Sequence, residues 1–309
     1  MVSPTKSVLS FLFVFIIGFA SGQSIDDQKL LQTIEYLSSD KLEGRKTLSE
    51  GNKEAQEFIR EEFKSLDLST HYAKYFQKFT FENRRERQKY EDATNVVAFI
   101  PGKDSRKIIV ITAHYDHVGI GRKNSSGDSI YNGADDNASG TAALLAFAAY
   151  FKENQPKHPI IFAALDGEEM GLQGAKALLN DFPFPIEDIL ININMDMISR
   201  NENGELYASG TYYNPYLKPI LENASKGSNP VLKFGHDEPN TGRDNWTQSS
   251  DHGPFFDQKI PHIYFGVEDH DDYHKPSDEF GNIDQAFYVN ATNLILKCIL
   301  ALDAELPKE

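Results

Sequence analysis

Short apolar runs and longer amphipathic segments alternate along most of the chain. The apolar runs are rich in β-branched residues and cover residues 94–100, 107–113, 159–165, 189–195 and 262–267. Several of them are apolar at consecutive positions, a pattern typical of strands that are covered on both faces. We therefore expect a central sheet with helices on both sides.

Apolar residues at helical spacing occur before, between and after these runs. They predict two helices within residues 24–67, and further helices at 139–154, 172–182, 214–226 and 284–306. Strands that alternate with helices indicate a mainly parallel sheet. The predicted fold is therefore α/β, a three-layer α/β/α sandwich with a mixed, largely parallel central sheet.

The first 22 residues have the layout of a secretory signal peptide. Lys6 precedes an apolar run, and Ala20 and Gly22 occupy the small positions before a cleavage site. The run has about 13 residues, whereas a membrane-spanning helix needs roughly 20. We expect export to the periplasm or the extracellular space after cleavage near Gly22. The alternative is an uncleaved anchor.

The rest of the chain, residues 23–309, is expected to form a single domain. Within it, residues 23–90 are predicted to be a helical part that packs on the remainder. No further segment is expected to reach transmembrane length, so we predict no stable membrane insertion.

Charge and cysteine content exclude two classes of partner. The formal net charge is -15, and removing the leader, which carries one lysine, makes it about -16. Nucleic-acid binding needs a basic surface, so we expect no nucleic-acid partner. Cys298 is the only cysteine, so we expect no disulfide partner.

Imidazole and carboxylate groups follow the predicted strands. Functional groups gather beyond the carboxyl ends of the strands in sheets of this kind. The segments that carry them are HYDH at 114–117, DGEEMG at 166–171, DMIS at 196–199 and EDHDDYHKPSDE at 268–279, with YNGADDNASG at 131–140 before a predicted helix.

A donor set of histidine and carboxylate without thiolate suits zinc, with Mn²⁺ or Co²⁺ as substitutes. Five candidate ligands exceed the three protein ligands of one catalytic zinc, so two ions sharing a bridging carboxylate are indicated. Glu168 and Glu169 are adjacent and do not easily bind one ion together. One of them is therefore free to act as a general base.

The motifs ITAHYDHVG, NGADDNASG, LDGEEMGLQG, NMDMI and DYHKPSDE resemble those of the co-catalytic di-zinc exopeptidases in order and approximate spacing. This family includes secreted bacterial leucyl aminopeptidases and glutamate carboxypeptidase II. The motifs extend from Ile111 to Glu279, and LEGRKTLSEGN at 42–52 is similar to the family's N-terminal segment.

The resemblance implies two zinc ions, five ligands and one base. Asp135 would bridge the ions, His114 and Asp196 would complete one site, Glu169 and His274 would complete the other, and Glu168 would be the general base for the water between the ions. It also implies a cis peptide bond between Asp135 and Asp136. His117 has no ligand role in the family pattern.

Other residues are candidates for supporting roles. By the same resemblance, Asp116 would orient His114, and Asp136, Asp251 and His252 would support the ligands or contact the substrate. A purely structural packing role for His252 stays open. Arg200 and Arg243 are candidates for binding a substrate carboxylate. The alternative is that each forms an ordinary salt bridge within the protein.

The resemblance favours a secreted aminopeptidase that hydrolyses N-terminal bonds of peptide or amino-acyl substrates. One alternative is an acyltransferase that resembles the glutaminyl cyclases, which use one zinc and tryptophans around the substrate. Trp246 is the only tryptophan here, which disfavours a cyclase. The chain could also be a carboxypeptidase of the same family, or a non-catalytic ectodomain.

Overall fold

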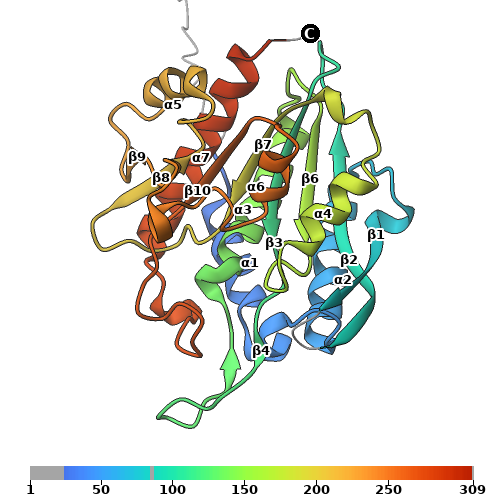
Figure 1. Ribbon diagram of the computed structural model, residues 1–309, viewed down its shortest axis with the longest axis vertical. Coiled ribbons are helices and arrows are strands. Elements are labelled where there is room, and N and C mark those ends of the chain that lie inside the picture. Colours follow the sequence, from blue (N-terminus) through green and yellow to red (C-terminus); the bar gives the residue numbers. More distant parts are fainter. Residues whose placement is uncertain (1–23, 84–86, 308–309) are drawn as a thin grey trace, which may run out of the picture.

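A computed structural model describes residues 24–83 and 87–307, and the predicted leader lies outside these residues. Within them, eight strands form one sheet in the order β1-β2-β6-β3-β7-β10-β8-β9 (Figure 1). The strands of this sheet are β1 (Phe76–Asn83), β2 (Gln88–Ile100), β3 (Ile108–His114), β6 (Ile160–Leu165), β7 (Ile189–Met195), β8 (Glu205–Ser209), β9 (Val231–Phe234) and β10 (His262–Gly266).

The centre of the sheet is parallel and its margins are mixed. Strands β6, β3, β7 and β10 run in one direction, while β2 and β8 pair antiparallel with their inner neighbours. Two short strands, β4 (Gly119–Ile120) and β5 (Ile130–Tyr131), form a separate ribbon. The predicted fold class is confirmed, and the five predicted strands are β2, β3, β6, β7 and β10.

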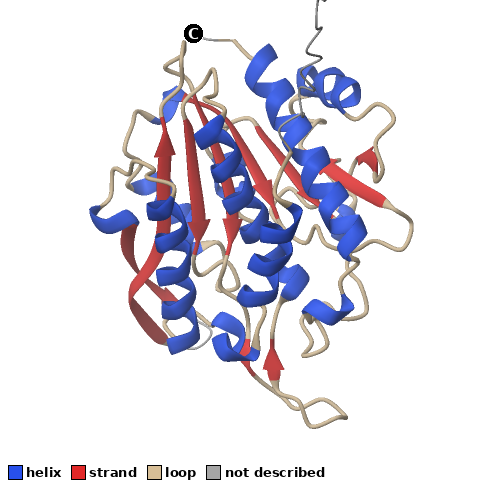
Figure 2. Ribbon diagram, turned by 180° about the vertical axis from the view of Figure 1, so that it is seen from behind, coloured by secondary structure: helices blue, strands red, loops and turns tan. Residues whose placement is uncertain are grey.

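Helices cover both faces of the sheet. The helices are α1 (Asp27–Leu37), α2 (Glu50–Ser65), α3 (Gly140–Glu153), α4 (Gln173–Asn180), α5 (Lys218–Ala224), α6 (His252–Asp257) and α7 (Gln285–Glu305). Helices α1, α2, α3 and α7 lie over one face (Figure 2), and α4 and α6 lie over the other (Figure 1).

Strand β3 shows why this arrangement needs consecutive apolar residues. Ile109 and Ile111 belong to the core under α1 and α3, whereas Ile108 and Val110 belong to the core under α4 and α6. Every residue of the strand is buried, because successive side chains point to opposite faces. The predicted three-layer organisation follows directly from this pattern.

Helix starts follow from local capping. The side chains of Asp26, Ser49 and Asp284 each accept a hydrogen bond from the main-chain N–H three residues later, at the first turns of α1, α2 and α7. Such caps satisfy N–H groups that have no partner within the helix.

Two expectations differ from the structure. The part predicted as helical, residues 23–90, contains strand β1 and the start of β2, because the alternating edge strand β1 carries several polar side chains. Helix α7 is also long and apolar enough to cross a membrane, which the sequence pattern alone did not indicate. More than half of its apolar window is buried inside the protein, where it packs against α1 and α5.

Candidate metal centre

The structure brings the predicted strand-end residues together beyond the carboxyl ends of the central strands. His114 is the last residue of β3, and Asp196 immediately follows β7. Glu168 and Glu169 lie in the loop between β6 and α4, and His274 lies beyond β10. Their side chains form two neighbouring groups.

The first group consists of His114, Glu168 and Asp196. The Nε2 atom of His114 lies 3.3 Å from Oδ1 of Asp196. On the other side of the ring, Nδ1 lies 3.1 Å from the main-chain oxygen of Asp116. If Nδ1 carries the proton and donates a hydrogen bond to this oxygen, Nε2 is left as a free ligand atom.

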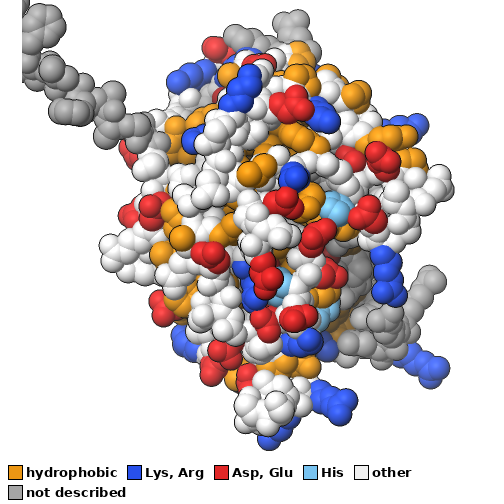
Figure 3. Space-filling model, turned by 90° about the vertical axis from the view of Figure 1, so that its left-hand side faces the viewer, with side chains coloured by type: hydrophobic (Ala, Val, Ile, Leu, Met, Phe, Trp, Pro, Cys, Tyr) orange, Lys and Arg blue, Asp and Glu red, His pale blue; other side chains and the backbone are white. Residues whose placement is uncertain are grey.

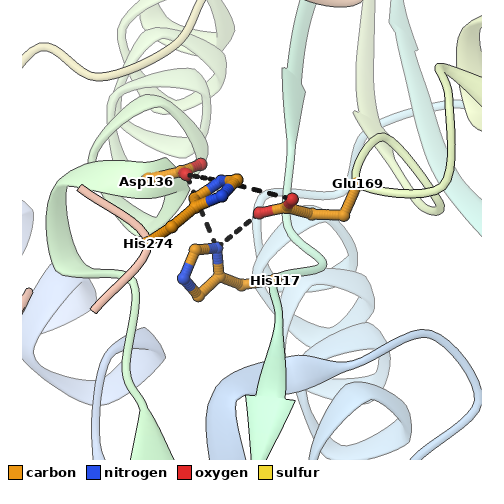
Figure 4. A group of neighbouring side chains, drawn as sticks. All are labelled: His117, Asp136, Glu169 and His274. Carbon is orange, nitrogen blue, oxygen red and sulfur yellow. Dashed lines mark ion pairs between the residues drawn. The ribbon is translucent and has the colours of Figure 1, made fainter. Parts of the chain in front are cut away.

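The second group consists of His117, Asp136, Glu169 and His274 (Figure 4). The Nε2 atom of His274 lies 3.0 Å from Oδ2 of Asp136 and 3.3 Å from Oε2 of Glu169. The Nδ1 atom of His117 lies 2.7 Å from Oε1 of Glu169. The family pattern gave His117 no ligand role, but its ring faces the same centre.

Asp136, and not Asp135, lies between the two groups. Oδ1 of Asp136 is 3.4 Å from Nε2 of His114, and its Oδ2 faces His274. Asp135 points elsewhere: its Oδ1 accepts hydrogen bonds from the N–H and hydroxyl groups of Ser199, both at 2.7 Å, and its Oδ2 lies 3.0 Å from Nε2 of His270. The cis peptide bond correspondingly follows Asp136 and joins it to Asn137.

The main chain around Asp136 is held by side chains from distant segments. The carboxylate of Asp278 accepts hydrogen bonds from the N–H groups of Asp135 at 2.9 Å and Asp136 at 3.1 Å. Gly133, with φ +57°, must lack a side chain, because a Cβ there would lie 2.1 Å from the carbonyl oxygen of Asp136. The two aspartates therefore have fixed and different orientations.

Arg45 is a second support, buried near the two candidate metal-binding groups. Its side chain is 1% exposed and donates to the main-chain oxygens of Tyr115 at 2.7 Å, Asn132 at 2.6 Å and Gly133 at 2.9 Å, and also to that of Leu37. The first three acceptors lie on the segments that carry His114 and Asp136, and Leu37 is the last residue of α1. The LEGR motif therefore ties the N-terminal part to the site.

Crowded carboxylates dominate the electrostatics. Burial lowers the pKa of His114, but the charges of Asp196 and Glu168 more than offset this and hold the pKa well above 6.5. Burial raises the pKa of Glu168 well above 4.5. Burial and the charge of Glu169 raise the pKa of Asp136. This excess of negative charge favours a cation.

The donor atoms fit zinc. Buried atoms without a hydrogen-bond partner include Nε2 of His114, Oδ1 of Asp196 and both ring nitrogens of His117. Two donors about 2.0–2.1 Å from a tetrahedral zinc are about 3.3 Å apart. The His114–Asp196, His114–Asp136 and His274–Glu169 donor distances are 3.3, 3.4 and 3.3 Å.

The remaining predicted residues surround the site in different ways. The Oδ1 atom of Asp116 lies 3.7 Å from Nδ1 of His114. It also accepts a hydrogen bond from the main-chain N–H of Glu168 at 3.1 Å. Asp251 is fully buried without a hydrogen-bond partner, and burial raises its pKa to about 8. His252 stacks between His262 and Tyr264, and burial lowers its pKa well below 6.5, which favours the packing role.

A cavity of about 250 Å³ opens onto the two groups. Neither Asp251 nor His252 lines it. The sequence had suggested Asp136, Glu168, Asp196, His274 and Arg243 for this region, but not the apolar and aromatic residues of the walls. The residues that line it are Asp136, Glu168, Asp196, Met197, Arg243, Trp246, Ser249, Tyr264, Val267, Asp269, Tyr273 and His274. Figure 3 shows acidic side chains gathered around partly exposed histidines on one face of the molecule.

Sequence comparison matches residues 95–299 to peptidase family M28. A probable zinc metalloprotease of Pyrenophora tritici-repentis is 29% identical over 214 residues, which cover 58% of this chain and 47% of that protein. The chain thus spans less than half the length of this curated relative.

Solved structures share the fold. BSAP, a zinc aminopeptidase from Bacillus subtilis, superimposes with a TM-score of 0.71 at 16% identity, over 88% of this chain and 94% of that chain. A glutaminyl cyclase from Bacteroides thetaiotaomicron superimposes with a TM-score of 0.70 at 16% identity, over 90% and 98%. At such low identity these likenesses establish the fold and leave the reaction to be argued from the site.

Proposed function

This chain belongs to peptidase family M28, and we propose that it is an aminopeptidase that removes N-terminal residues from peptides with the help of two zinc ions. The observation that carries the proposal is the pairing of two groups of metal-binding side chains around the Asp136 carboxylate. A zinc-dependent peptidase follows from the family. Our proposal adds two points to this family assignment, the aminopeptidase specificity and the second zinc ion.

We assign the ligands from the geometry of the two groups. His114 and Asp196 would hold one ion, Glu169 and His274 would hold the other, and Asp136 would give one oxygen to each. When bound, zinc supplies Lewis acidity, which polarises a peptide carbonyl and lowers the pKa of water.

Glu168 is the proposed general base. It lies beside His114 and Asp196, and its main-chain N–H is fixed by Asp116. Burial raises the pKa of its carboxyl group, which makes it a stronger base than a solvent-exposed glutamate. Glu168 would accept a proton from the attacking water and later deliver it to the nitrogen of the leaving amine.

The cavity supports an exopeptidase. Its volume of about 250 Å³ is below the roughly 300–1,000 Å³ typical of pockets for drug-sized ligands. It therefore suits one or two residues at a chain end. Met197, Tyr264 and Val267 offer apolar wall surface, and the exposed carboxylate of Asp269 offers a counter-charge for an N-terminal ammonium group.

A single-zinc glutaminyl cyclase is the second candidate. It is favoured by the fold shared with the Bacteroides enzyme and by the position of Trp246 in the cavity wall. Metal content separates the two, since two ions per chain support the aminopeptidase and one supports the cyclase. A carboxypeptidase would instead require a free C-terminal carboxylate on every substrate.

Export is a separate proposal. We propose that residues 1–22 direct export and are removed near Gly22. Mass spectrometry of the protein isolated from culture medium or periplasm should give a mature N-terminus at Gln23. An intact N-terminus on an exported product would contradict cleavage.

The decisive experiment uses a panel of aminoacyl-p-nitroanilides, with metal content measured in parallel. Wild type should cleave free-amine substrates, and a chelator should abolish cleavage. Glu168→Gln should keep its zinc but lose at least about 100-fold in kcat, the lower range for general acid–base catalysis. Glu187→Gln, at an exposed glutamate, is the matched control. Wild type that holds two zinc ions and cleaves none of the panel would refute the aminopeptidase.

A further inference from the structure

Arg243 is the only arginine or lysine among the residues that line the cavity. It lies in a short helical turn, Gly242–Asp244 (η6), between β9 and α6. Its side chain is exposed. Within the described part of the chain, no carboxylate lies in ion-pair distance of its guanidinium group, and no hydrogen bond engages it. Its positive charge is therefore available to bind an anionic group of a ligand.

Neighbouring charges already have other partners. Arg200, the second arginine that the sequence suggested for carboxylate binding, is paired with Asp272 at 2.5 Å. Asp244, next to Arg243, lies 2.8 Å from Nδ1 of His236. Beneath the metal-binding groups, the buried guanidinium of Arg45 already provides positive charge near Asp136 and Glu169. Arg243 is thus not needed to neutralise the carboxylates of the site, and its place in the cavity wall calls for another explanation.

The segment that carries Arg243 is anchored next to the cavity. The ring of His236 stacks on Trp246 with 3.6 Å between centroids, and Trp246 itself lines the cavity. The main-chain N–H of Trp246 donates to the carbonyl oxygen of His236 at 2.6 Å. Asn245 donates to the main-chain oxygen of Glu238 at 2.9 Å. These contacts fix the main chain on both sides of Arg243, whose side chain lines the cavity.

We propose that Arg243 binds a carboxylate of the substrate. A guanidinium group presents parallel N–H donors that match a carboxylate. The proposal rests on the exopeptidase function above and narrows its substrates to short peptides with a carboxylate near the scissile bond. That carboxylate is either an acidic N-terminal side chain or the free C-terminus of a dipeptide.

Two substrate pairs distinguish these sources. Glutamyl- and glutaminyl-p-nitroanilide differ only in the side-chain charge, and Leu-Gly and Leu-Gly-amide differ only at the C-terminus. Wild type should prefer the charged member of at least one pair. Arg243→Met should lower kcat/KM for that member about tenfold, mainly through KM, and leave the neutral member within about twofold. Arg243→Lys should keep part of the preference.

Arg122→Met, at an exposed arginine between β4 and β5 outside the cavity lining, is the matched control and should leave the preference unchanged. If Arg243→Met reduces both members of each pair equally, or if wild type shows no preference for charge, the proposal is overturned.

Binding separates failure of this proposal from failure of the peptidase. If wild type cleaves neither these substrates nor any of the aminoacyl-p-nitroanilide panel, the aminopeptidase proposal fails, and isothermal titration then compares glutamic acid α-amide with glutamine α-amide and Leu-Gly with its amide. Tighter binding of a charged member to wild type, lost in Arg243→Met, supports the carboxylate site. Equal binding of the charged and neutral members overturns it.

Discussion

Asp135 and Asp136 are consecutive residues whose carboxylates serve different partners. Asp135 accepts hydrogen bonds from Ser199, whereas Asp136 lies between His114 and His274. Asp136→Asn should therefore reduce bound zinc from about two ions per chain to one or none, and should lower kcat/KM at least about 100-fold. Metal analysis by mass spectrometry after dialysis measures the first effect.

Asp135→Asn is the matched control for this prediction. The amide oxygen can still accept from Ser199, so this variant should retain its zinc even if its melting temperature falls. The reverse outcome, with zinc lost from Asp135→Asn and kept by Asp136→Asn, would restore the assignment suggested by the sequence.

The choice between these two residues shows where sequence reasoning stops. His114, Glu168, Glu169, Asp196 and His274 could be placed, because parallel strands bring their carboxyl ends to one edge of the sheet. Asp135 and Asp136 are adjacent in one turn, so the same rule places both of them near the site and does not distinguish them. Which of them faces the centre depends on the bend at Gly133 and on hydrogen bonds from residues far away in the chain.

The same limit applies to His117 and to three strands of the sheet. His117 follows His114 by three residues, and only the path of the chain after β3 turns its ring toward Glu169. Strands β1, β8 and β9 were also not predicted. They lie at or near the margins of the sheet and have mixed burial, so their hydrophobic pattern is weak.

His117 should contribute to metal affinity. Its Nδ1 lies 2.7 Å from Oε1 of Glu169, so its ring either orients this ligand or joins it. We expect His117→Ala to weaken one of the two proposed zinc sites about 10–100-fold and leave the other unchanged. Competition with a chromophoric chelator measures both sites. His71→Ala is the control, because His71 is exposed and packs on Phe99 and Phe184. Unchanged affinity in His117→Ala would exclude the role.

Arg45 should be a main determinant of stability. Arg45→Met leaves main-chain oxygens of Tyr115, Asn132 and Gly133 buried without their donor. We expect a loss of about 3–5 kcal/mol in the free energy of unfolding, measured by urea denaturation of the metal-free protein. Arg60→Met is the control, since Arg60, whose side chain is 23% exposed, pairs with the exposed Glu57 and Glu61, and its loss should cost less than about 1 kcal/mol. Equal losses would contradict the role of Arg45.

Asp303, which lies in α7, should make the free energy of unfolding depend on pH in the acid range. Burial raises its pKa, but hydrogen bonds from the ring of His158 and from the N–H groups of Lys157 and His158 more than offset this and lower the pKa below 3.8. Since the folded pKa is depressed, the stabilisation is present above the unfolded value and is lost as the pH falls through the folded pKa.

Asp303→Asn should therefore cost about 1–3 kcal/mol in the free energy of unfolding at pH 7, with the difference from wild type shrinking as the pH falls below about 3.8. Urea denaturation of both proteins across this range measures the difference. Asp92→Asn, at an exposed ion pair with Lys78, should change the free energy by less than about 1 kcal/mol at every pH. A difference between Asp303→Asn and wild type that stays constant with pH would show that the hydrogen bonds to Asp303 do not depend on its charge.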